Sequence, residues 1–126
     1  MGLQRTIRFP NDSRPQWESV RLAFARVSES PVVRMIDDLP AFPDEIPEPG
    51  WRELRLSLTG GMVTLRSTPG GWDCVIWGNA EVGLLKSWNA ACWAVAEAGK
   101  GSVVLDDGAL GTAGEFRERL PLDQSF

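Results

Sequence analysis

The chain has 126 residues, of which 43% are hydrophobic, and this is the size of one ordinary domain with a single core. Its formal net charge of −4 argues against a general binder of nucleic acids or of anionic membranes. Histidine is absent, which excludes Ser-His-Asp and Cys-His catalytic pairs and histidine-based metal sites. Tyrosine is also absent, which leaves mainly carboxylates and thiols for general acid or base catalysis.

The N-terminal third of the chain predicts a strand, a helix and a second strand. Residues 5–9 alternate polar and apolar side chains and stop at a proline, which is typical of a strand at or near a sheet edge. Ser13 and Gln16 have the spacing of a helix capping box. The apolar face of this helix follows at three- and four-residue steps and consists of Trp17, Val20, Phe24 and Val27. We expect the helix to end before a β-branched strand at residues 31–36.

Residues 37–50 form a proline-rich, acidic connection, which we call the acidic loop. It holds four prolines, five acidic residues and no basic residue, a local charge of −5. Proline removes a backbone donor and favours extended geometry in the preceding residue, so we expect little regular structure here. Two interpretations stay open. One is a surface loop pinned to the core by Leu39, Phe42 and Ile46, and the other is an arm that binds a partner.

A β-hairpin is predicted at the next stretch of the chain. Leucine alternates with polar residues over residues 53–58, which predicts a strand with one buried face. Gly60-Gly61 then predicts a two-residue turn, because glycine takes a positive φ without steric cost. We expect this turn to pair Leu58 with Val63 and to place apolar side chains opposite one another.

The following turn, at residues 68–71, leaves two strand registers open. A two-residue loop sets Cys74 opposite Leu65, whereas a three-residue loop with a bulge sets Val75 there. The strand at residues 72–77 is apolar on nearly every position, so either register fills the core. The register decides which of its two tryptophans joins the leucine face.

The C-terminal part predicts a long helix, a strand and a short helix. Asn79 is a suitable N-cap for the long helix, which we expect to end at Gly99. Its core stripe consists of Leu84, Leu85, Trp88, Ala91, Cys92 and Val95. A strand follows at residues 102–105, and a capping box at Thr112 opens the short helix. We expect the tail, residues 121–126, to be loose.

The predicted order is therefore strand, helix, four strands, helix, strand and short helix. Helices segregated from a mostly antiparallel sheet, with one long helix packed on it, define a single α+β domain over residues 1–126. In element order alone, the first seven elements resemble the TBP-like and helix-grip folds. Such folds serve many functions, so the order implies no activity.

The sequence offers little chemistry. Cys74 and Cys92 lack CxxC spacing and are predicted to be buried, reduced thiols of a cytoplasmic protein. Neither a secretory signal nor a membrane-spanning segment is recognised. Asp37-Asp38 and Asp106-Asp107 could meet at a divalent metal, but aspartate at a strand end commonly forms a turn. We therefore assign no catalytic residue, cofactor or metal ligand.

Tryptophan and exposed apolar residues are the best candidates for a functional surface. Trp93 lies about 140° round the helical wheel from the core stripe, and one strand tryptophan faces away from the leucines. Tryptophan is enriched at protein interfaces, where it serves as an anchor. The candidate interface or pocket residues are Trp72, Trp77, Trp88, Trp93, Phe42 and Ile46.

Three function classes follow. The leading hypothesis is a non-enzymatic module that binds a protein partner, with a homodimer as one version. The alternative is a small-ligand domain whose tryptophan-lined cavity, bordered by Trp88 and Cys74, lies between sheet and long helix. The weakest is a carboxylate-dependent enzyme, which requires the two aspartate pairs to converge.

Overall fold

Residues 2–126, which the computed structural model describes, form one eight-stranded antiparallel sheet and three α-helices. The strands are β1 (Leu3–Arg8), β2 (Val32–Ile36), β3 (Leu39–Pro40), β4 (Glu53–Leu58), β5 (Gly61–Thr68), β6 (Gly71–Ile76), β7 (Ser102–Val104) and β8 (Leu110–Thr112). The helices are α1 (Trp17–Ala25), α2 (Val82–Gly99) and α3 (Ala113–Glu118), with 3-10 turns at Pro10–Asp12 and Leu122–Gln124. Within these residues no helix combines the length and apolarity that crossing a bilayer requires.

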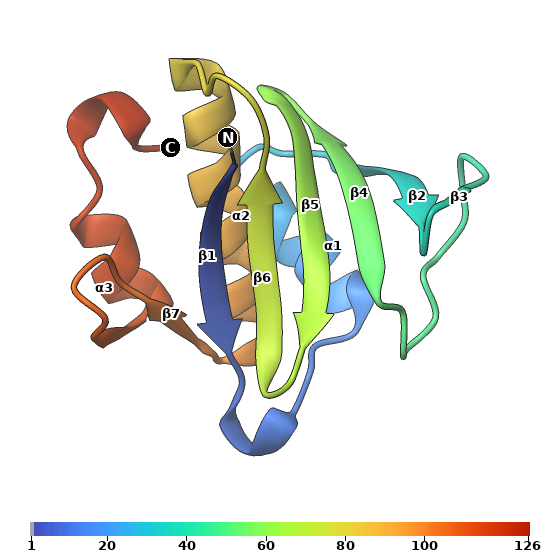
Figure 1. Ribbon diagram of the computed structural model, residues 1–126, viewed down its shortest axis with the longest axis horizontal. Coiled ribbons are helices and arrows are strands. Elements are labelled where there is room, and N and C mark those ends of the chain that lie inside the picture. The colour runs from blue at the N-terminus through green and yellow to red at the C-terminus, as the bar shows by residue number, and fades with distance from the viewer. Residues whose placement is uncertain (1) are drawn as a thin grey trace.

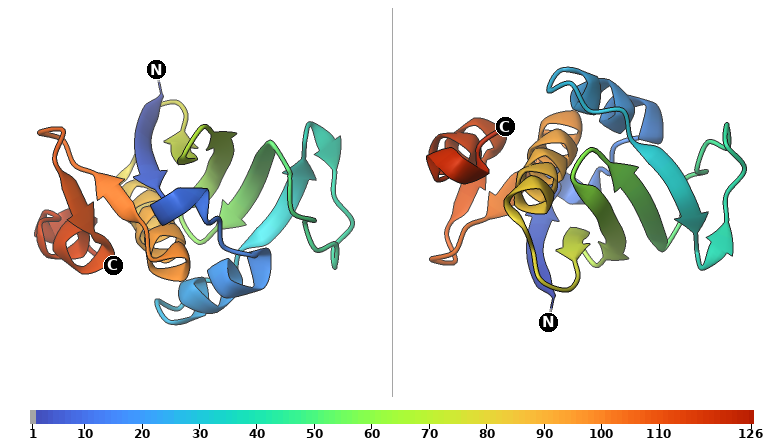
Figure 2. Two further views of the ribbon diagram at one scale, coloured as in Figure 1. Left: turned by 90° about the horizontal axis from the view of Figure 1, so that it is seen from below. Right: turned by 90° about the horizontal axis from the view of Figure 1, so that it is seen from above.

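The sheet has the strand order β3-β2-β4-β5-β6-β1-β7-β8, so the N-terminal strand lies inside it, between β6 and β7. Figures 1 and 2 show α1 and α2 on one face of the sheet and α3 beside the edge formed by β7 and β8. The predicted α+β class, with a long helix packed on an antiparallel sheet, is confirmed. The short strands β3 and β8 were not predicted, because two or three paired residues leave no periodic signal in the sequence.

The core lies between α2 and one face of the sheet. Alternate residues of β4, β5 and β6 point into it, and α2 contributes a broad small-residue and apolar face. The fully buried side chains include Leu54, Leu56, Val63, Leu65, Cys74, Ile76, Ala91, Cys92 and Val95.

The first hairpin forms where the sequence predicts it, but its register differs by two residues. Leu58 pairs with Gly61, and Leu56 pairs with Val63, so the expected pairing of Leu58 with Val63 is wrong. We attribute this register to the packing of Gly60. A Cβ there would lie 2.0 Å from the carbonyl oxygen of Gly83, at the start of α2. Gly60 is therefore required by the close approach of two backbones.

The second hairpin takes the two-residue loop of the two open alternatives. Leu65 pairs with Cys74, and Thr68 pairs with Gly71. Trp72 consequently joins the leucine face and is buried, whereas Trp77 lies at the surface with 53% of its area exposed.

Two predicted helix starts are wrong and one is confirmed. Helix α1 begins after Gln16 without a side-chain cap, and α2 begins after Glu81 instead of Asn79. The Ser13 capping box does not form. The capping box that opens α3 does form: Thr112 Oγ1 accepts from the N–H of Glu115 at 3.1 Å, and the Glu115 carboxylate accepts from the N–H of Thr112 at 3.0 Å.

Arg14 holds the segment before α1 against the β5–β6 turn. Its guanidinium donates to the carbonyl oxygens of Thr68 at 2.5 Å and Gly71 at 3.1 Å, and to the hydroxyl of Ser67. This long-range contact fixes the segment before α1, although it does not cap the free N–H groups of the helix.

The C-terminal tail, which we expected to be loose, packs against α2. The side-chain amide of Asn89 donates to the carbonyl oxygen of Gln124 at 3.1 Å. The ring of Phe126 lies 6.0 Å from that of Trp93, and Arg117 donates to the carbonyl oxygen of Phe126 at 2.7 Å. Asn89 is fully buried in α2, so it fixes the tail from the core.

Candidate functional site

The six candidate residues divide into three that are buried and three at the surface. Trp72, Trp88 and Trp93 are buried, and each has a structural partner. The indole N–H of Trp88 donates to the carbonyl oxygen of Cys74 at 3.0 Å. The tail covers Trp93, and the ring of Trp51 lies 4.7 Å from that of Trp72.

The residues expected to line a cavity between the sheet and the long helix do not border one. Trp88 and Cys74, which were to border it, are packed in the hydrophobic core. The thiol of Cys74 is also in its unreactive, protonated form. The neighbouring Cys92 thiol, together with complete burial, raises the pKa of Cys74 well above its usual range. A thiol held in this neutral state does not act as a nucleophile.

The three surface candidates are Trp77, Phe42 and Ile46. Trp77 lies on the sheet face opposite α2, where the guanidinium carbon of Arg66 stacks 4.9 Å from its ring. Charged side chains also lie on that face, together with the apolar Met62 and Val75. Glu53 forms ion pairs with Arg55 at 3.2 Å and with Arg66 at 3.1 Å across it.

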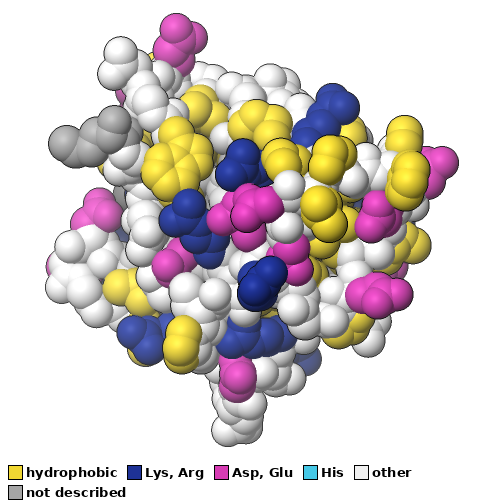
Figure 3. Space-filling view, turned by 45° about the vertical axis from the view of Figure 1, so that its right-hand side comes forward, with side chains coloured by type: hydrophobic (Ala, Val, Ile, Leu, Met, Phe, Trp, Pro, Cys, Tyr) yellow, Lys and Arg dark blue, Asp and Glu magenta, His cyan; other side chains and the backbone are white. Residues whose placement is uncertain are grey.

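The acidic loop exposes the apolar side chains that were expected to pin it. Leu39, Phe42 and Ile46 are 69%, 78% and 68% exposed, so they do not hold the loop to the core. Among the loop prolines, Pro47 is buried instead. In Figure 3, which turns the edge carrying β2 and β3 forward, hydrophobic and acidic side chains lie next to each other on this part of the surface.

Asp37 closes the loop at its base. Asp37 and Asp38 form the two-residue turn between β2 and β3, with φ values of 50° and 67° in the left-handed region that aspartate tolerates. The Asp37 carboxylate accepts from the backbone N–H groups of Arg52 at 2.7 Å and Glu53 at 2.9 Å. The carboxylate of the first loop residue therefore binds the backbone just after the end of the loop.

We expect Asp37 to make stability depend on pH. The N–H groups of Glu53 and Arg52 lower the pKa of Asp37, because they bind its charged form. A carboxyl group with a lower pKa in the folded state stabilises the fold above its unfolded pKa of about 3.9, and this contribution is lost as the pH falls through the folded pKa. Urea unfolding at several pH values from about 6 to 2 measures this effect. As the pH falls, the unfolding free energy of Asp37→Asn should decrease less than that of the wild type. The matched variant Asp123→Asn, at an exposed aspartate, should show the same dependence of unfolding free energy on pH as the wild type. The same pH dependence for all three proteins would show that Asp37 does not contribute to it.

A groove lies between the acidic loop and the start of α1, and we call it the tryptophan groove. Its volume is about 730 Å³, within the roughly 300–1,000 Å³ of typical ligand sites. Its apolar lining comprises Trp17, Trp51, Trp72, Pro15, Ile46, Pro47 and Pro49. Its rim charges are partly neutralised within the chain, since Arg14 pairs with Asp12 at 2.9 Å. The groove therefore favours an apolar, uncharged group.

The aspartate pairs do not meet. Asp37 and Asp38 follow β2, whereas Asp106 and Asp107 follow β7, and β4, β5, β6 and β1 lie between these two strands. Five strand spacings of about 4.8 Å separate the pairs by roughly 24 Å, too far for a shared carboxylate site. Within residues 2–126 no group of three or more Cys, Asp or Glu side chains is placed to hold a metal ion.

Sequence reasoning missed several residues of this surface, among them Trp17, Trp51 and Arg14. Trp51 follows the last proline of the acidic loop, so its position beside a predicted exposed segment was the available signal.

Comparisons with protein-family models, with curated proteins and with solved structures find no match to this chain. The geometry of the acidic loop and the tryptophan groove is therefore the only guide to function.

Proposed function

We propose that this chain is a non-enzymatic protein-interaction module that binds its partner through the acidic loop and the adjoining tryptophan groove. The observation that carries the proposal is the exposure of Leu39, Phe42 and Ile46 on one loop. Full burial of a large apolar side chain contributes roughly 1.5–3 kcal/mol, so exposing three of them together forgoes substantial stabilisation unless a partner covers them.

The charge of the loop indicates the kind of partner. Residues 37–50 hold five acidic residues and no basic residue. Asp37 and Asp38 form ion pairs with Arg52 at 4.0 Å and Arg55 at 3.7 Å, which leaves Asp44, Glu45 and Glu48 as the acids nearest in sequence to Phe42 and Ile46. A complementary surface would present an apolar patch bordered by lysine or arginine. Such pairing accelerates association and weakens as salt screens it.

The tryptophan groove supplies the second half of the surface. Ile46 belongs both to the exposed side chains of the loop and to the groove lining, so the two features are continuous. Interfaces commonly gain most of their affinity from a few aromatic anchors in a desolvated pocket. An apolar side chain of the partner fits this groove, while the basic residues around it face the loop carboxylates.

A different protein fits this surface better than a second copy. In a two-fold dimer formed by the loop alone, both copies would present the same patch, and each loop carries five acids. Like charges juxtaposed across an interface are costly. Pairing through the sheet edges is also disfavoured, because the edge strands β3 and β8 have only two and three residues.

Site-specific photo-cross-linking in the native host cell tests the proposal. A benzophenone amino acid replaces Phe42 in one version and Leu122, which is 95% exposed on the tail, in the matched control. We expect one dominant adduct with a basic protein from position 42 and none from position 122. The yield should fall when Asp44, Glu45 and Glu48 are replaced by their amides.

Two outcomes would overturn parts of this proposal. Identical adducts from positions 42 and 122 would show that the loop has no specific partner. An adduct of twice the chain mass would show that the partner is a second copy, which light scattering of the purified chain at micromolar concentration would then confirm.

A further inference from the structure

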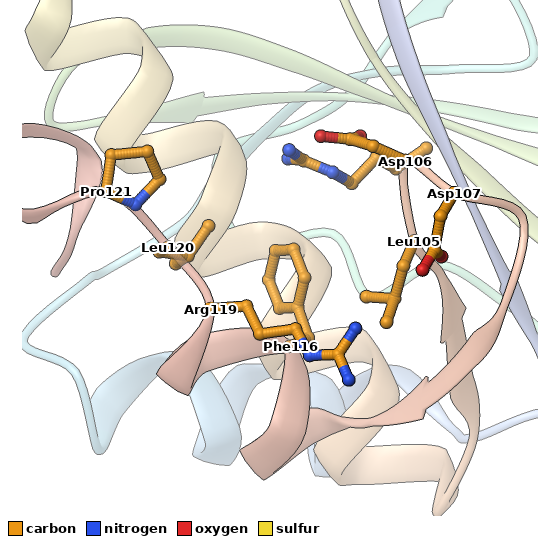
Figure 4. A pocket seen from close by; sticks show the side chains of 8 residues that line it. Leu105, Asp106, Asp107, Phe116, Arg119, Leu120 and Pro121 are labelled. Atoms are coloured by element: carbon orange, nitrogen blue, oxygen red, sulfur yellow. The ribbon is translucent and has the colours of Figure 1, made fainter.

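A second, smaller hollow lies at the opposite edge of the sheet from the acidic loop, and we call it the edge pocket. It has a volume of about 230 Å³ and is formed by β1, the segment after β7, and the segment from α3 to Pro121. Figure 4 shows Asp106 and Asp107 on one side of it and Leu120 and Pro121 on the other, with the ring of Phe116 between them.

One guanidinium of the edge pocket, that of Arg5, is held in a fixed orientation. Its guanidinium carbon lies 4.0 Å from the Trp88 ring centroid and 5.0 Å from that of Phe116. It also donates to the side-chain oxygen of Asn89, which is fully buried. A planar, partly buried guanidinium that is already oriented can bind a carboxylate at little entropic cost.

The charges of the edge pocket do not neutralise one another. Over residues 2–126, the ion pairs within 4.0 Å include neither Arg5 nor Arg119, and neither Asp106 nor Asp107. Two cationic and two anionic groups therefore line one small cavity without an ion-pair partner, although Arg5 donates to Asn89 and Asp107 accepts from the N–H of Ala109 at 3.0 Å. Arg5 is half-buried, whereas Arg119, Asp106 and Asp107 are exposed at the mouth of the pocket, and a ligand with both signs would pair with both kinds of group.

We propose that the edge pocket binds a small zwitterion of the α-amino acid class. The ligand carboxylate faces Arg5 and Arg119, its ammonium group faces Asp106 and Asp107, and an apolar side chain contacts Phe116. The pocket is smaller than the roughly 300–1,000 Å³ of sites for drug-sized ligands, which fits so compact a molecule. This site is independent of the proposed protein interaction, because it lies at the other edge of the sheet.

A thermal-shift screen of the twenty standard L-amino acids at about 10 mM tests the proposal, because a ligand that binds the native state raises the melting temperature. The amino acid with the largest shift is then titrated by calorimetry beside its N-acetyl form, which lacks the ammonium group, and its amide, which lacks the carboxylate. We expect each modified form to bind at least about tenfold more weakly, since each loses one charged contact.

Variants locate the site. Arg119→Ala and Asp106→Asn, both at exposed positions, should weaken binding at least about tenfold, while Arg8→Ala on the opposite face of β1 should leave it unchanged. Near-ultraviolet circular dichroism confirms that each variant is folded. The proposal is overturned if no amino acid raises the melting temperature, if the N-acetyl form binds as tightly as the free amino acid, or if Arg8→Ala weakens binding as much as Arg119→Ala.

Discussion

Gly71→Ala is expected to lower the free energy of unfolding by more than about 3 kcal/mol. A Cβ at this position would lie 1.9 Å from the carbonyl oxygen of Ile7 and 2.9 Å from its carbonyl carbon. Both atoms belong to the backbone of β1, which pairs with β6 at this point through Arg8 and Gly71. The strand cannot move away without breaking its ladder with β6, so no side-chain rotation relieves the clash.

Urea unfolding of Gly71→Ala and Gly114→Ala provides the comparison. Gly114 lies in α3, where a Cβ would have its nearest neighbour 4.0 Å away. Alanine at this helical position should be neutral or stabilise the protein by up to about 1 kcal/mol, because it reduces the entropy of the unfolded chain. Equal stability of the two variants would contradict the close packing of β1 on β6.

Glu29→Ala is expected to cost about 2–4 kcal/mol, because the buried Glu29 carboxylate joins three separate elements. One carboxylate oxygen accepts from the N–H of Thr59 at 3.0 Å and from its hydroxyl at 2.8 Å. The other accepts from the hydroxyl of Ser87 at 3.1 Å. Ser87 itself accepts from the N–H of Gly60 at 2.8 Å, so the network ties the end of α1 to the first hairpin and to α2.

Chemical unfolding of three glutamate variants separates this network from a simple loss of charge. Glu29→Gln keeps the size of the side chain but offers only one acceptor oxygen, so we expect a smaller loss than for Glu29→Ala. Glu48→Ala, at an exposed position, should change stability by no more than about 0.5 kcal/mol. If Glu29→Ala lowered the unfolding free energy by less than about 1 kcal/mol, water would be replacing the carboxylate. That result would contradict the role of the buried carboxylate in holding the three elements together.

Local patterns were sufficient to predict most elements of the fold. The alternation of leucine at positions 54, 56 and 58 indicated the buried face of β4, and the spacing of Thr112 and Glu115 indicated the start of α3. The errors concern contacts between segments far apart in the chain. We attribute the hairpin register to the approach of Gly60 to Gly83, and no local pattern contains that contact.

The sequence also indicated one part of the candidate site, the acidic loop, but not the other, the tryptophan groove. The prolines and acids of residues 37–50 indicated a loop that could present Phe42 and Ile46, and both are exposed. The tryptophan groove could not be predicted, because Trp17, Trp51 and Trp72 come from α1, the end of the acidic loop and β6. Their meeting is a consequence of the strand order and not of any spacing in the sequence.

The unfolding free energy of the double variant Phe42→Ser/Ile46→Ser tests most directly whether the apolar side chains of the acidic loop serve a partner or the fold. Both side chains are more than two-thirds exposed, so we predict a change of less than about 1 kcal/mol from the wild type in urea. A loss of about 3 kcal/mol or more, the size expected for removing core side chains, would show that they anchor the loop and would contradict its assignment as a binding surface.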